Sequence, residues 1–419
     1  MKATTIIVMI LFFSFVFLPC ESAYSFNGYM ETNALYFPHK EDMFESRNRL
    51  FLEEKEDSKD WLTLYISGRT EVLLSNREGE RNDIFVRLDD TYLNLYLGKG
   101  EVKIGYSKVF WGKLDQLTPT DIVNPLDISK LFLETERKNA KSPVPLFMIS
   151  PYFGQQSRLD CIIVPFFEEG TYDELNERSS PFNIEHFPSP FDKLPVEEQL
   201  PSKNVGNMEY GGRFSSIFRE IDWSLYYFRG FCDFPMYKLT YRFNPILNEF
   251  IPDTIQAEYF KYNMFGYDFE FVKGKWGIRG EGAFFTDQGF QKKGVLDYIK
   301  GNSFTVGFGV DRSFGDNNLN FSALYKKISV DSDIEERRKE ITLLGHVERK
   351  FSYETKVIKL FSIYNTMSNS IFLKGMVSIN ILENLWTDLS IGIFKGREKD
   401  ALSRFEDSDF FYVKCKYNF

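Results

Sequence analysis

Charged side chains recur two residues apart along this chain, and that spacing decides what chemistry they could do. Arg69 and Glu71, like Arg279 and Glu281, stand within stretches of alternating apolar and polar residues. Residues i and i+2 of a β-strand point to the same side of the sheet, so each pair shares a face. Facing groups of opposite charge can select solutes in a passage, or they can pair across strands and stiffen a wall. The candidates on such faces are Arg69, Glu71, Lys103, Trp111, Lys113, Arg213, Asp268, Glu270, Arg279, Glu281, Lys374, Lys414 and Lys416.

A second group of charges lies in an acidic, proline-rich stretch at residues 168–205. Carboxylates at this density could bind divalent ions that are shared with lipopolysaccharide. The spacing does not match an EF-hand, which needs alternating ligands and a central glycine within about twelve residues. A solvated outer loop is therefore the favoured interpretation.

Residue types that serve catalysis and metal binding are sparse. The three histidines, His39, His186 and His346, are far apart, and the cysteines after residue 22 form no CxxC pair. No G-x-S-x-G, HExxH or phosphate-binding glycine loop is present. His346 falls on a polar strand face, where a wall or packing role is favoured over catalysis. We therefore predict a protein that is not an enzyme, with no cofactor, no metal and no catalytic residue. The net charge of -9 argues against nucleic acid as a partner.

Alternating segments of about ten residues are the elements that must position these charges. The pattern is clear at residues 62–75, 101–113, 276–284, 371–381 and 385–393, where one face is apolar and the other carries the charges. No later run approaches the roughly 18 apolar residues of a spanning helix. In lipid, strands must close so that every backbone amide is paired, and a lipid-facing charge costs about 2–4 kcal/mol. The sequence therefore predicts an all-β, transmembrane antiparallel up-and-down barrel.

The lengths of the connections give an orientation. Short turns are expected near residues 98–100, 274–275, 315–317, 352–353 and 383–384, and long polar connections alternate with them. Outer-membrane barrels have short periplasmic turns and long outer loops. This alternation predicts about 18 strands, within 16–20, with both termini in the periplasm.

The two ends of the chain carry export signals. Lys2, the apolar residues 6–18 and the small residues before a cut after Ser22 predict a signal peptide at residues 1–22. Cutting after Ala23 is an alternative, and Pro19 disfavours lipidation of Cys20. Residues 23–419 are then one barrel domain. The alternating final strand ends at Phe419 and resembles the signal by which outer-membrane proteins engage the barrel-assembly machinery. An edge strand of a soluble sandwich is the alternative, but such an edge invites aggregation.

The connection at residues 114–145 is long for a hairpin loop and holds many apolar residues. One hypothesis is that it folds into the lumen and narrows it, with Trp111 packed at its root. The alternative is an outer loop that covers the barrel mouth. The polar and stiffening positions of this possible constriction loop are Asp121, Asn124, Pro125 and Asp127.

A local motif suggests a family. The strand end G-Y-S-K-V-F-W-G at residues 105–112, followed by N-P-L-D at 124–127, resembles an uncharacterised, porin-like family of Gram-negative outer-membrane barrels that is catalogued as a domain of unknown function. The resemblance implies a barrel that works with export or lipid-handling systems, and it supplies no substrate. The proline-rich 168–205 region and the shorter length depart from it.

We therefore expect a porin-like outer-membrane channel or transporter that passes or exports a small or amphipathic solute. The alternative is a plugged structural, assembly or surface-binding barrel without conductance. The expected partners are outer-membrane lipid and lipopolysaccharide, the assembly machinery through Phe419 and an unknown solute. The sequence leaves undecided whether the barrel forms a homo-oligomer.

Overall fold

The computed structural model describes residues 27–77, 81–134, 137–185, 187, 189–396 and 402–419. The predicted signal peptide lies outside the described residues.

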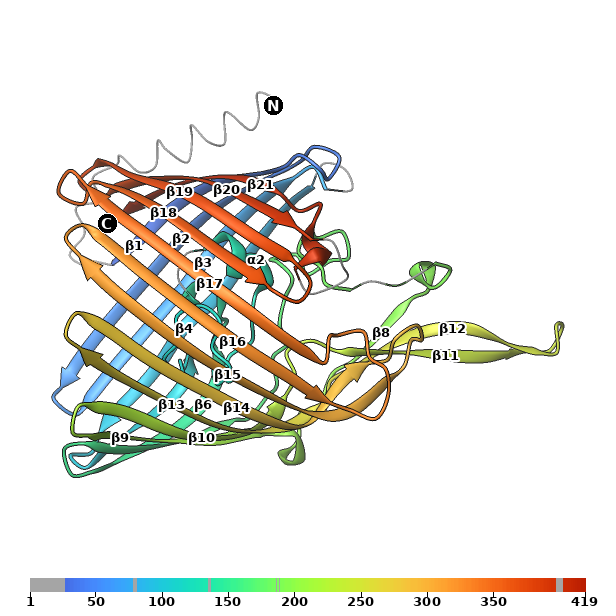
Figure 1. Ribbon diagram of the computed structural model, residues 1–419, viewed down its shortest axis with the longest axis horizontal. Helices are drawn as coiled ribbons and strands as arrows, with labels where there is room; N and C mark the ends of the chain where they lie inside the picture. The colour runs from blue at the N-terminus through green and yellow to red at the C-terminus, as the bar shows by residue number, and fades with distance from the viewer. Residues whose placement is uncertain (1–26, 78–80, 135–136, 186, 188, 397–401) are drawn as a thin grey trace.

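The described chain forms a closed antiparallel barrel of 18 strands, which confirms the predicted fold class (Figure 1). Each barrel strand pairs with the next along the chain, and β1 pairs with β21 to close the ring. The strands are β1 (Asn27–Phe37), β2 (Met43–Lys59), β3 (Leu62–Ser75), β4 (Arg81–Tyr96), β5 (Gly100–Ser107), β6 (Val144–Phe153), β7 (Ser157–Val164), β9 (Glu209–Phe218), β10 (Ile221–Phe231), β13 (Lys261–Lys273), β14 (Trp276–Gln291), β15 (Tyr298–Phe314), β16 (Asn317–Ser329), β17 (Lys339–Phe351), β18 (Lys356–Asn365), β19 (Ser370–Leu382), β20 (Leu385–Lys395) and β21 (Phe410–Asn418).

The final residue takes part in the closure. The backbone amide of Gly28 donates to the carbonyl of Phe419, and the amide of Phe419 donates to the carbonyl of Gly28, both at 3.0 Å. The β1–β21 register runs from Tyr29 opposite Asn418 to Tyr36 opposite Phe411. The last strand therefore has a partner on each side, because β20 pairs with its other edge.

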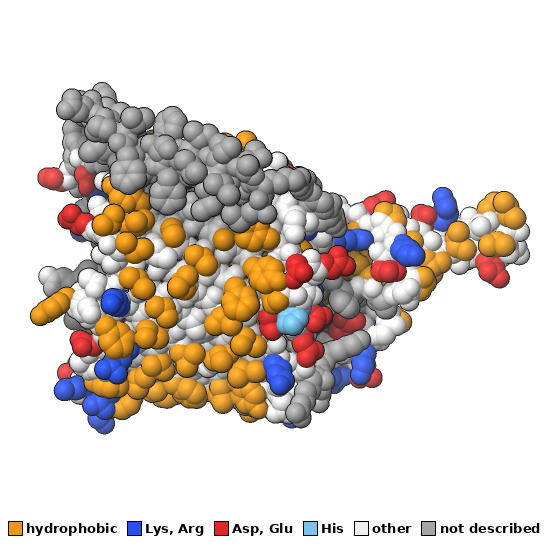
Figure 2. All heavy atoms as spheres, turned by 90° about the horizontal axis from the view of Figure 1, so that it is seen from above, with side chains coloured by type: hydrophobic (Ala, Val, Ile, Leu, Met, Phe, Trp, Pro, Cys, Tyr) orange, Lys and Arg blue, Asp and Glu red, His pale blue; other side chains and the backbone are white. Residues whose placement is uncertain are grey.

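The two faces of the wall differ as the alternation predicts. Outward residues are apolar and exposed, as at Ile84, Val86 and Leu88 on β4, and Figure 2 shows hydrophobic side chains spread over the wall with charges gathered toward its ends. Inward charges are buried, as at Glu71 and Glu281. Among the described residues, no helix is long and apolar enough to cross a membrane.

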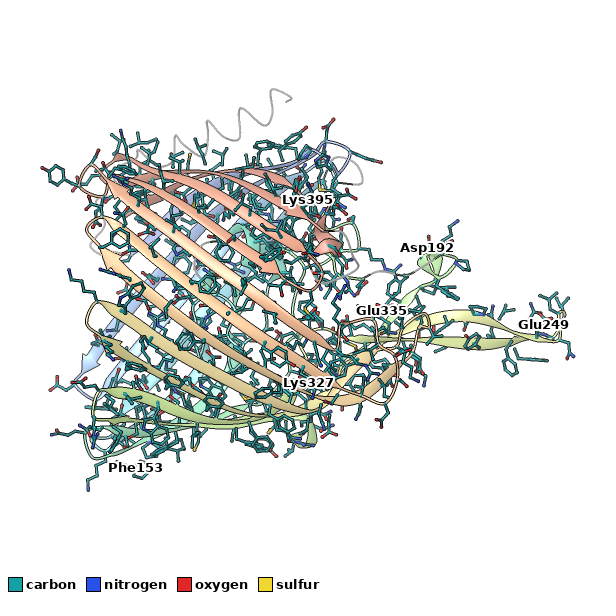
Figure 3. All side chains as sticks on the ribbon, viewed as in Figure 1. Phe153, Asp192, Glu249, Lys327, Glu335 and Lys395 are labelled. Atoms are coloured by element: carbon teal, nitrogen blue, oxygen red, sulfur yellow. The ribbon has the colours of Figure 1, made fainter. Side chains whose placement is uncertain are left out.

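Short turns and long connections lie at opposite ends of the barrel. The first and last described residues, Asn27 and Phe419, lie at the end of the barrel that carries the short turns and Phe153. The long connections leave the other end, as Figures 1 and 3 show. One connection forms a projecting hairpin of β11 (Met236–Asn244) and β12 (Glu249–Glu258), and β8 (Val196–Gln199) runs parallel to β12. The helical turns are α2 (Ile128–Leu133), η1 (Arg137–Ala140), η2 (Phe191–Lys193), η3 (Val205–Asn207) and η4 (Ser403–Phe405).

The predicted strand at residues 101–113 is too long. In the structure β5 ends at Ser107. The next backbone amides turn to side chains instead of a neighbouring strand: Lys108 donates to Asp90 and Val109 donates to Asn124, both at 2.7 Å. The apolar residues that follow are thereby drawn into the lumen.

Candidate functional site

The described residues 108–134 and 137–143 between β5 and β6 run across the inside of the barrel, and we call them the crossing segment. Near its start, Trp111 is buried against Tyr226 and Phe228 of β10, with ring centroids 5.2 and 6.0 Å away. Gly112 follows with a φ of +82°, and a Cβ there would meet the Glu281 carboxylate. The sharp turn after Trp111 therefore requires glycine.

Glu281 of β14 is the anchor for this first part of the crossing segment. One carboxylate oxygen accepts the backbone amides of Lys113 and Leu114, at 3.0 and 3.2 Å. The other accepts the amide and the hydroxyl of Thr120, at 2.8 and 2.7 Å. Lys113 also pairs with Asp222 at 2.6 Å and with Glu270 at 3.5 Å. A fully buried carboxylate with four donors is well satisfied, and it holds the segment against the β10–β14 wall.

The N-P-L-D residues tie the middle of the crossing segment together. The Asn124 amide donates to the carbonyls of Ser107 and Ser142 and so joins the two stems. The carbonyl of Pro125 accepts the amide of Ser142 at 3.0 Å. Asp127 caps α2 by accepting from the Lys130 amide at 3.1 Å, which satisfies a donor that the helix leaves open. Asp121 accepts from the Trp111 amide at 3.2 Å, and its carboxylate also pairs with Arg137 at 3.3 Å.

The far end of the crossing segment docks on β19–β21. Phe132 of α2 lies in an aromatic cluster with Phe182, Phe372, Phe394 and Phe405. The buried Lys374 donates to the carbonyl of Leu133. Glu134 pairs with Lys414 at 3.2 Å. Burial alone would raise the pKa of Glu134, but the Lys414 and Arg49 cations lower it to about 2. The segment therefore spans the lumen from one wall to the opposite one.

Residues 171–185 form a second inward piece, which we call the acidic segment. It runs beside α2, because the amides of Ile128 and Ser129 donate to the carbonyls of Thr171 and Tyr172. The expectation of a solvated outer loop at 168–205 is wrong for this part, since Asp173 and Glu174 are only 1 % and 5 % exposed. The inward basic residues attract these carboxylates into the lumen.

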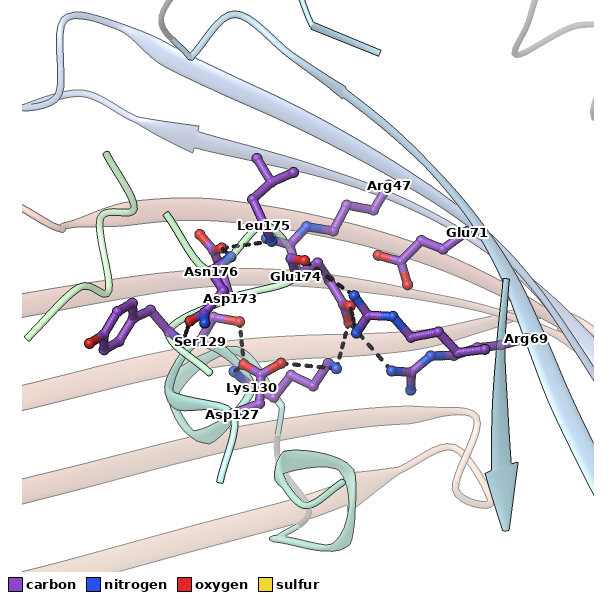
Figure 4. A network of polar contacts seen from close by, with 12 residues as sticks. Arg47, Arg69, Glu71, Asp127, Ser129, Lys130, Asp173, Glu174, Leu175 and Asn176 are labelled. Atoms are coloured by element: carbon purple, nitrogen blue, oxygen red, sulfur yellow. Dashed lines mark hydrogen bonds and ion pairs between the residues drawn. The ribbon is translucent and has the colours of Figure 1, made fainter. Parts of the chain in front are cut away.

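The acidic segment meets a dense charge network on the β2–β4 wall, drawn in Figure 4. Asp173 pairs with Arg77 at 2.7 Å. Glu174 pairs with Lys130 at 2.6 Å, with Arg87 at 2.8 Å and with Arg69 at 3.7 Å. We call these residues and the neighbouring charges of the wall the sealed network; its members are Glu31, Glu45, Arg47, Arg49, Arg69, Glu71, Arg77, Arg87, Asp89, Lys130, Asp173 and Glu174.

Because these charges are buried, their pKa values depend strongly on the ion pairs. Desolvation would raise the pKa of Asp173, but the guanidinium groups of Arg77 and Arg47 hold it below its usual value. The pKa of Glu174 is held well below its usual value by Lys130, Arg69 and Arg87, against the same desolvation. A buried charge is tolerated only when it is paired and hydrogen-bonded. The β2–β4 side of the lumen is therefore filled with mutually dependent charges.

The opposite side of the lumen keeps a cavity of about 430 Å³. Leu114, Asp115 and Leu117 of the crossing segment form one side of it, together with Arg137. Residues of β14–β18 form the other side, among them Arg279, Asp311, Asn320, His346 and Phe361. We call it the open cavity.

Arg279 organises the charges of the open cavity. Its guanidinium contacts Asp115 at 2.8 Å, Asp311 at 2.9 Å and Glu270 at 3.0 Å. Arg279 is thus shared between the barrel wall and the crossing segment. The cavity combines a cation, several carboxylates and apolar side chains, so it can contact both polar and apolar parts of a small molecule.

The other predicted residues lie apart from both regions. Lys103 stands 4.3 Å from the Tyr92 ring and Lys416 stands 3.9 Å from the Tyr29 ring. Arg213 stands 5.7 Å from the Tyr226 ring, and the Tyr226 hydroxyl donates to Asp268. Lys374 is only 3 % exposed and does not line an open path. These residues, which the sequence predicted together, therefore take part in several separate contacts.

The sequence reasoning missed much of the sealed network. Arg47 and Arg49 alternate on β2 exactly as Arg69 and Glu71 do on β3, so the same signal could have found them. Arg77, Lys130, Asp173 and Glu174 come from connections, where strand alternation gives no signal.

Known proteins resemble this chain in fold and not in sequence. No family model matches the chain, and no curated protein matches it in sequence. Three solved structures from Pseudomonas aeruginosa are similar in fold. The outer membrane protein OpdK has a TM-score of 0.53 at 10 % identity, with 94 % of this chain and 98 % of OpdK covered. OccK5 (OpdH) has 0.52 at 11 %, with 94 % and 97 % covered. OccD3 (OpdP) has 0.51 at 8 %, with 94 % and 91 % covered.

OpdK is an outer membrane protein, and the feature that this chain shares with the three structures is the barrel. A closed ring of strands with an apolar outer face is stable only where lipid surrounds it. The protein is therefore an outer-membrane barrel of the porin-like architecture.

Proposed function

We propose that the protein is a porin-like channel in which small polar or amphipathic solutes pass along the β14–β18 side of the lumen. The open cavity is the observation that carries this proposal. Its volume of about 430 Å³ falls within the roughly 300–1,000 Å³ of small-molecule sites. On the opposite side, the hollow beside Arg47 and Glu134 measures only about 10 Å³.

The chemistry of the cavity supports a solute with both a polar and an apolar part. Arg137, which also pairs with Asp121, brings a cation to the lining beside Leu117, and Phe361 and His346 bring aromatic rings. One structural neighbour, OpdK, has been crystallised with vanillate, which is a small aromatic carboxylate. A molecule of that class would find a complementary cation and apolar contacts in this cavity.

A plugged barrel without conductance is the second candidate. The observation that favours it is the crossing segment, which is anchored on opposite walls by Glu281 and by the Phe132 cluster. In that case the barrel would serve as a surface-binding or assembly module. The resemblance to the uncharacterised barrel family and the expected interaction of Phe419 with the assembly machinery stay predictions.

Planar-bilayer recordings separate the two candidates. The full-length mature protein should open ion-conducting channels. His346→Trp places a large ring in the open cavity and should reduce the conductance at least about twofold, because the narrowest part of a pore limits the current. Val347→Trp is the matched control, since Val347 is the next residue on β17, points to the lipid side and is 42 % exposed. This variant should leave the conductance unchanged.

A silent wild-type barrel would overturn the channel proposal in favour of the plugged one. Equal conductance in His346→Trp and wild type would show that ions take another path.

A further inference from the structure

The lipid-facing wall changes character at the extracellular ends of β15, β16 and β17. Its outward columns run through Phe304, Tyr325 and Ile341. Beyond this apolar rim, each column reaches a lysine: Lys300 on β15, Lys327 on β16 and Lys339 on β17. Figure 3 places Lys327 where the barrel meets its long connections.

Two of these lysines are held together by the sheet. Lys327 lies directly opposite Lys339 in the β16–β17 register. Like charges at directly opposed positions destabilise an antiparallel pair. Among the residues that the structure describes, no carboxylate comes within ion-pair distance of either ammonium group. The strand pairing thus concentrates positive charge without an internal partner.

A surface hollow of about 740 Å³ collects this charge. Lys300, Lys327, Arg338 and Lys339 line it together with the polar side chains of Asn302 and Ser329. Two carboxylates, Asp287 and Asp331, also line it. Asp287 accepts hydrogen bonds from Asn263 and Thr286, and Arg338 has a loose contact of 3.8 Å with Asp333. Four cations against two lining carboxylates leave an excess of positive charge, although the whole chain carries -9.

The position of the hollow indicates what it binds. Long connections mark the extracellular end of such barrels, so the hollow stands just above the apolar belt on the outer-leaflet side. A ligand there could rest its acyl chains on Phe304, Tyr325 and Ile341 while its headgroup meets the lysines. Lysine ammonium groups are effective phosphate ligands, and basic residues at this level attract anionic lipid.

We propose that this hollow is a binding site for the phosphate groups of an outer-leaflet glycolipid, the lipid A part of lipopolysaccharide. The phosphates sit between Lys327 and Lys339 and relieve their mutual repulsion, and Lys300 and Arg338 complete the set of donors. The site is independent of solute passage, since it lies on the opposite face of the wall from the lumen.

Binding of diphosphorylated lipid A to the full-length mature protein in detergent tests the proposal, with native mass spectrometry as the readout. The double variant Lys327→Gln/Lys339→Gln should bind about 25-fold more weakly, at about fivefold for each lysine near an anionic headgroup. Lys327→Arg/Lys339→Arg should keep the affinity, because it keeps both charges. Lys273→Gln/Lys275→Gln is the matched control; it removes two exposed charges from a periplasmic turn and should change nothing. Heat-modifiable mobility on gels checks that each variant is folded.

Two further probes distinguish the source of the phosphate. Lipid A without phosphates should bind as weakly to wild type as lipid A does to the Gln variant. Inorganic phosphate at the same concentration should not compete, because it lacks the acyl contacts. Unchanged lipid A binding by the Gln variant would overturn the site, and full competition by inorganic phosphate would overturn the lipid assignment.

Discussion

The two sides of the lumen carry the same types of charged residue, but one side is filled and the other keeps a cavity. On the β2–β4 side, arginines and carboxylates are paired and buried around Asp173 and Glu174. On the β14–β18 side, Arg279 is also paired, yet a cavity of about 430 Å³ remains beside it. The difference lies in the connections, because the acidic segment fills one side and only the edge of the crossing segment reaches the other. An inward charge therefore does not by itself indicate a solute path.

The largest effect should follow from breaking the sealed network. Asp173→Asn combined with Glu174→Gln takes one ion-pair partner from each of the buried Arg77 and Lys130, which keep Glu45 and Asp127. It also removes the carboxylate that pairs with the partly exposed Arg87. Losing one partner of a buried pair costs about 3–5 kcal/mol. The acidic segment should leave the lumen, the channel conductance should rise and the midpoint of heat unfolding should fall. Single-channel recording and gel mobility on heating measure both changes.

Asp192→Asn is the control for this variant, because Asp192 belongs to the same connection but is exposed in η2. If the double variant conducted and unfolded like wild type, the network would not hold the acidic segment in place.

Releasing the crossing segment should have the next largest effect. Glu281→Ala removes the acceptor of four hydrogen bonds, and a bond to a charged group contributes about 1.5–3 kcal/mol. The crossing segment should loosen at its first anchor, which would appear as larger fluctuations of the open-channel current. Glu281→Gln keeps one acceptor oxygen and should fluctuate less than the alanine variant. Identical current noise in all three proteins would exclude Glu281 as an anchor.

Acid should weaken the buried ion pairs of the two inward segments. The pKa values of Asp173, Glu174 and Glu134 are all lowered by nearby cations. A lowered carboxyl pKa stabilises the folded form above the ordinary value of about 4, and the contribution is lost as the pH falls toward the folded value, which is about 2 for Glu134. The midpoint of heat unfolding should therefore drop between about pH 4 and pH 2. The Asp173→Asn/Glu174→Gln variant should drop less, and an equal drop would place the acid sensitivity elsewhere.

The smallest effect is expected at Arg279. Arg279→Gln leaves Asp115, Glu270 and Asp311 without their shared cation. The pore should become more selective for cations, which a reversal potential in a salt gradient measures. Arg349→Gln on the outward face of β17 should give no shift. A shift of equal size in both variants would mean that Arg279 acts only through net charge.

Alternation predicted the barrel because lipid forces it. On β3 the apolar Leu64 faces outward and the polar Thr63 faces the lumen, as the alternation requires. The turn lengths then predicted about 18 strands and an orientation, and the strand number is confirmed. The same rule found Arg69, Arg279 and Glu281, since each has a wall position that the pleat dictates.

The contents of the lumen could not be predicted in the same way. Asp173 and Glu174 have no strand periodicity, and their acidity is equally typical of a solvated loop. Only the three-dimensional proximity of Arg77, Arg87 and Lys130 draws them inward. Their placement depends on contacts between residues that are far apart in the chain, which one sequence does not display.

Thiol accessibility tests most directly whether water follows one side of the lumen and not the other. In a protein with Cys161, Cys232 and Cys415 replaced by serine, Asn320→Cys lies in the open cavity and Asn33→Cys lies on the sealed side, where Asn33 is 5 % exposed. A charged, water-soluble thiol reagent should modify Asn320→Cys at least about tenfold faster, since a buried group reacts only after local opening, and should reduce its conductance. Modification of Asn33→Cys at the same rate would contradict the account.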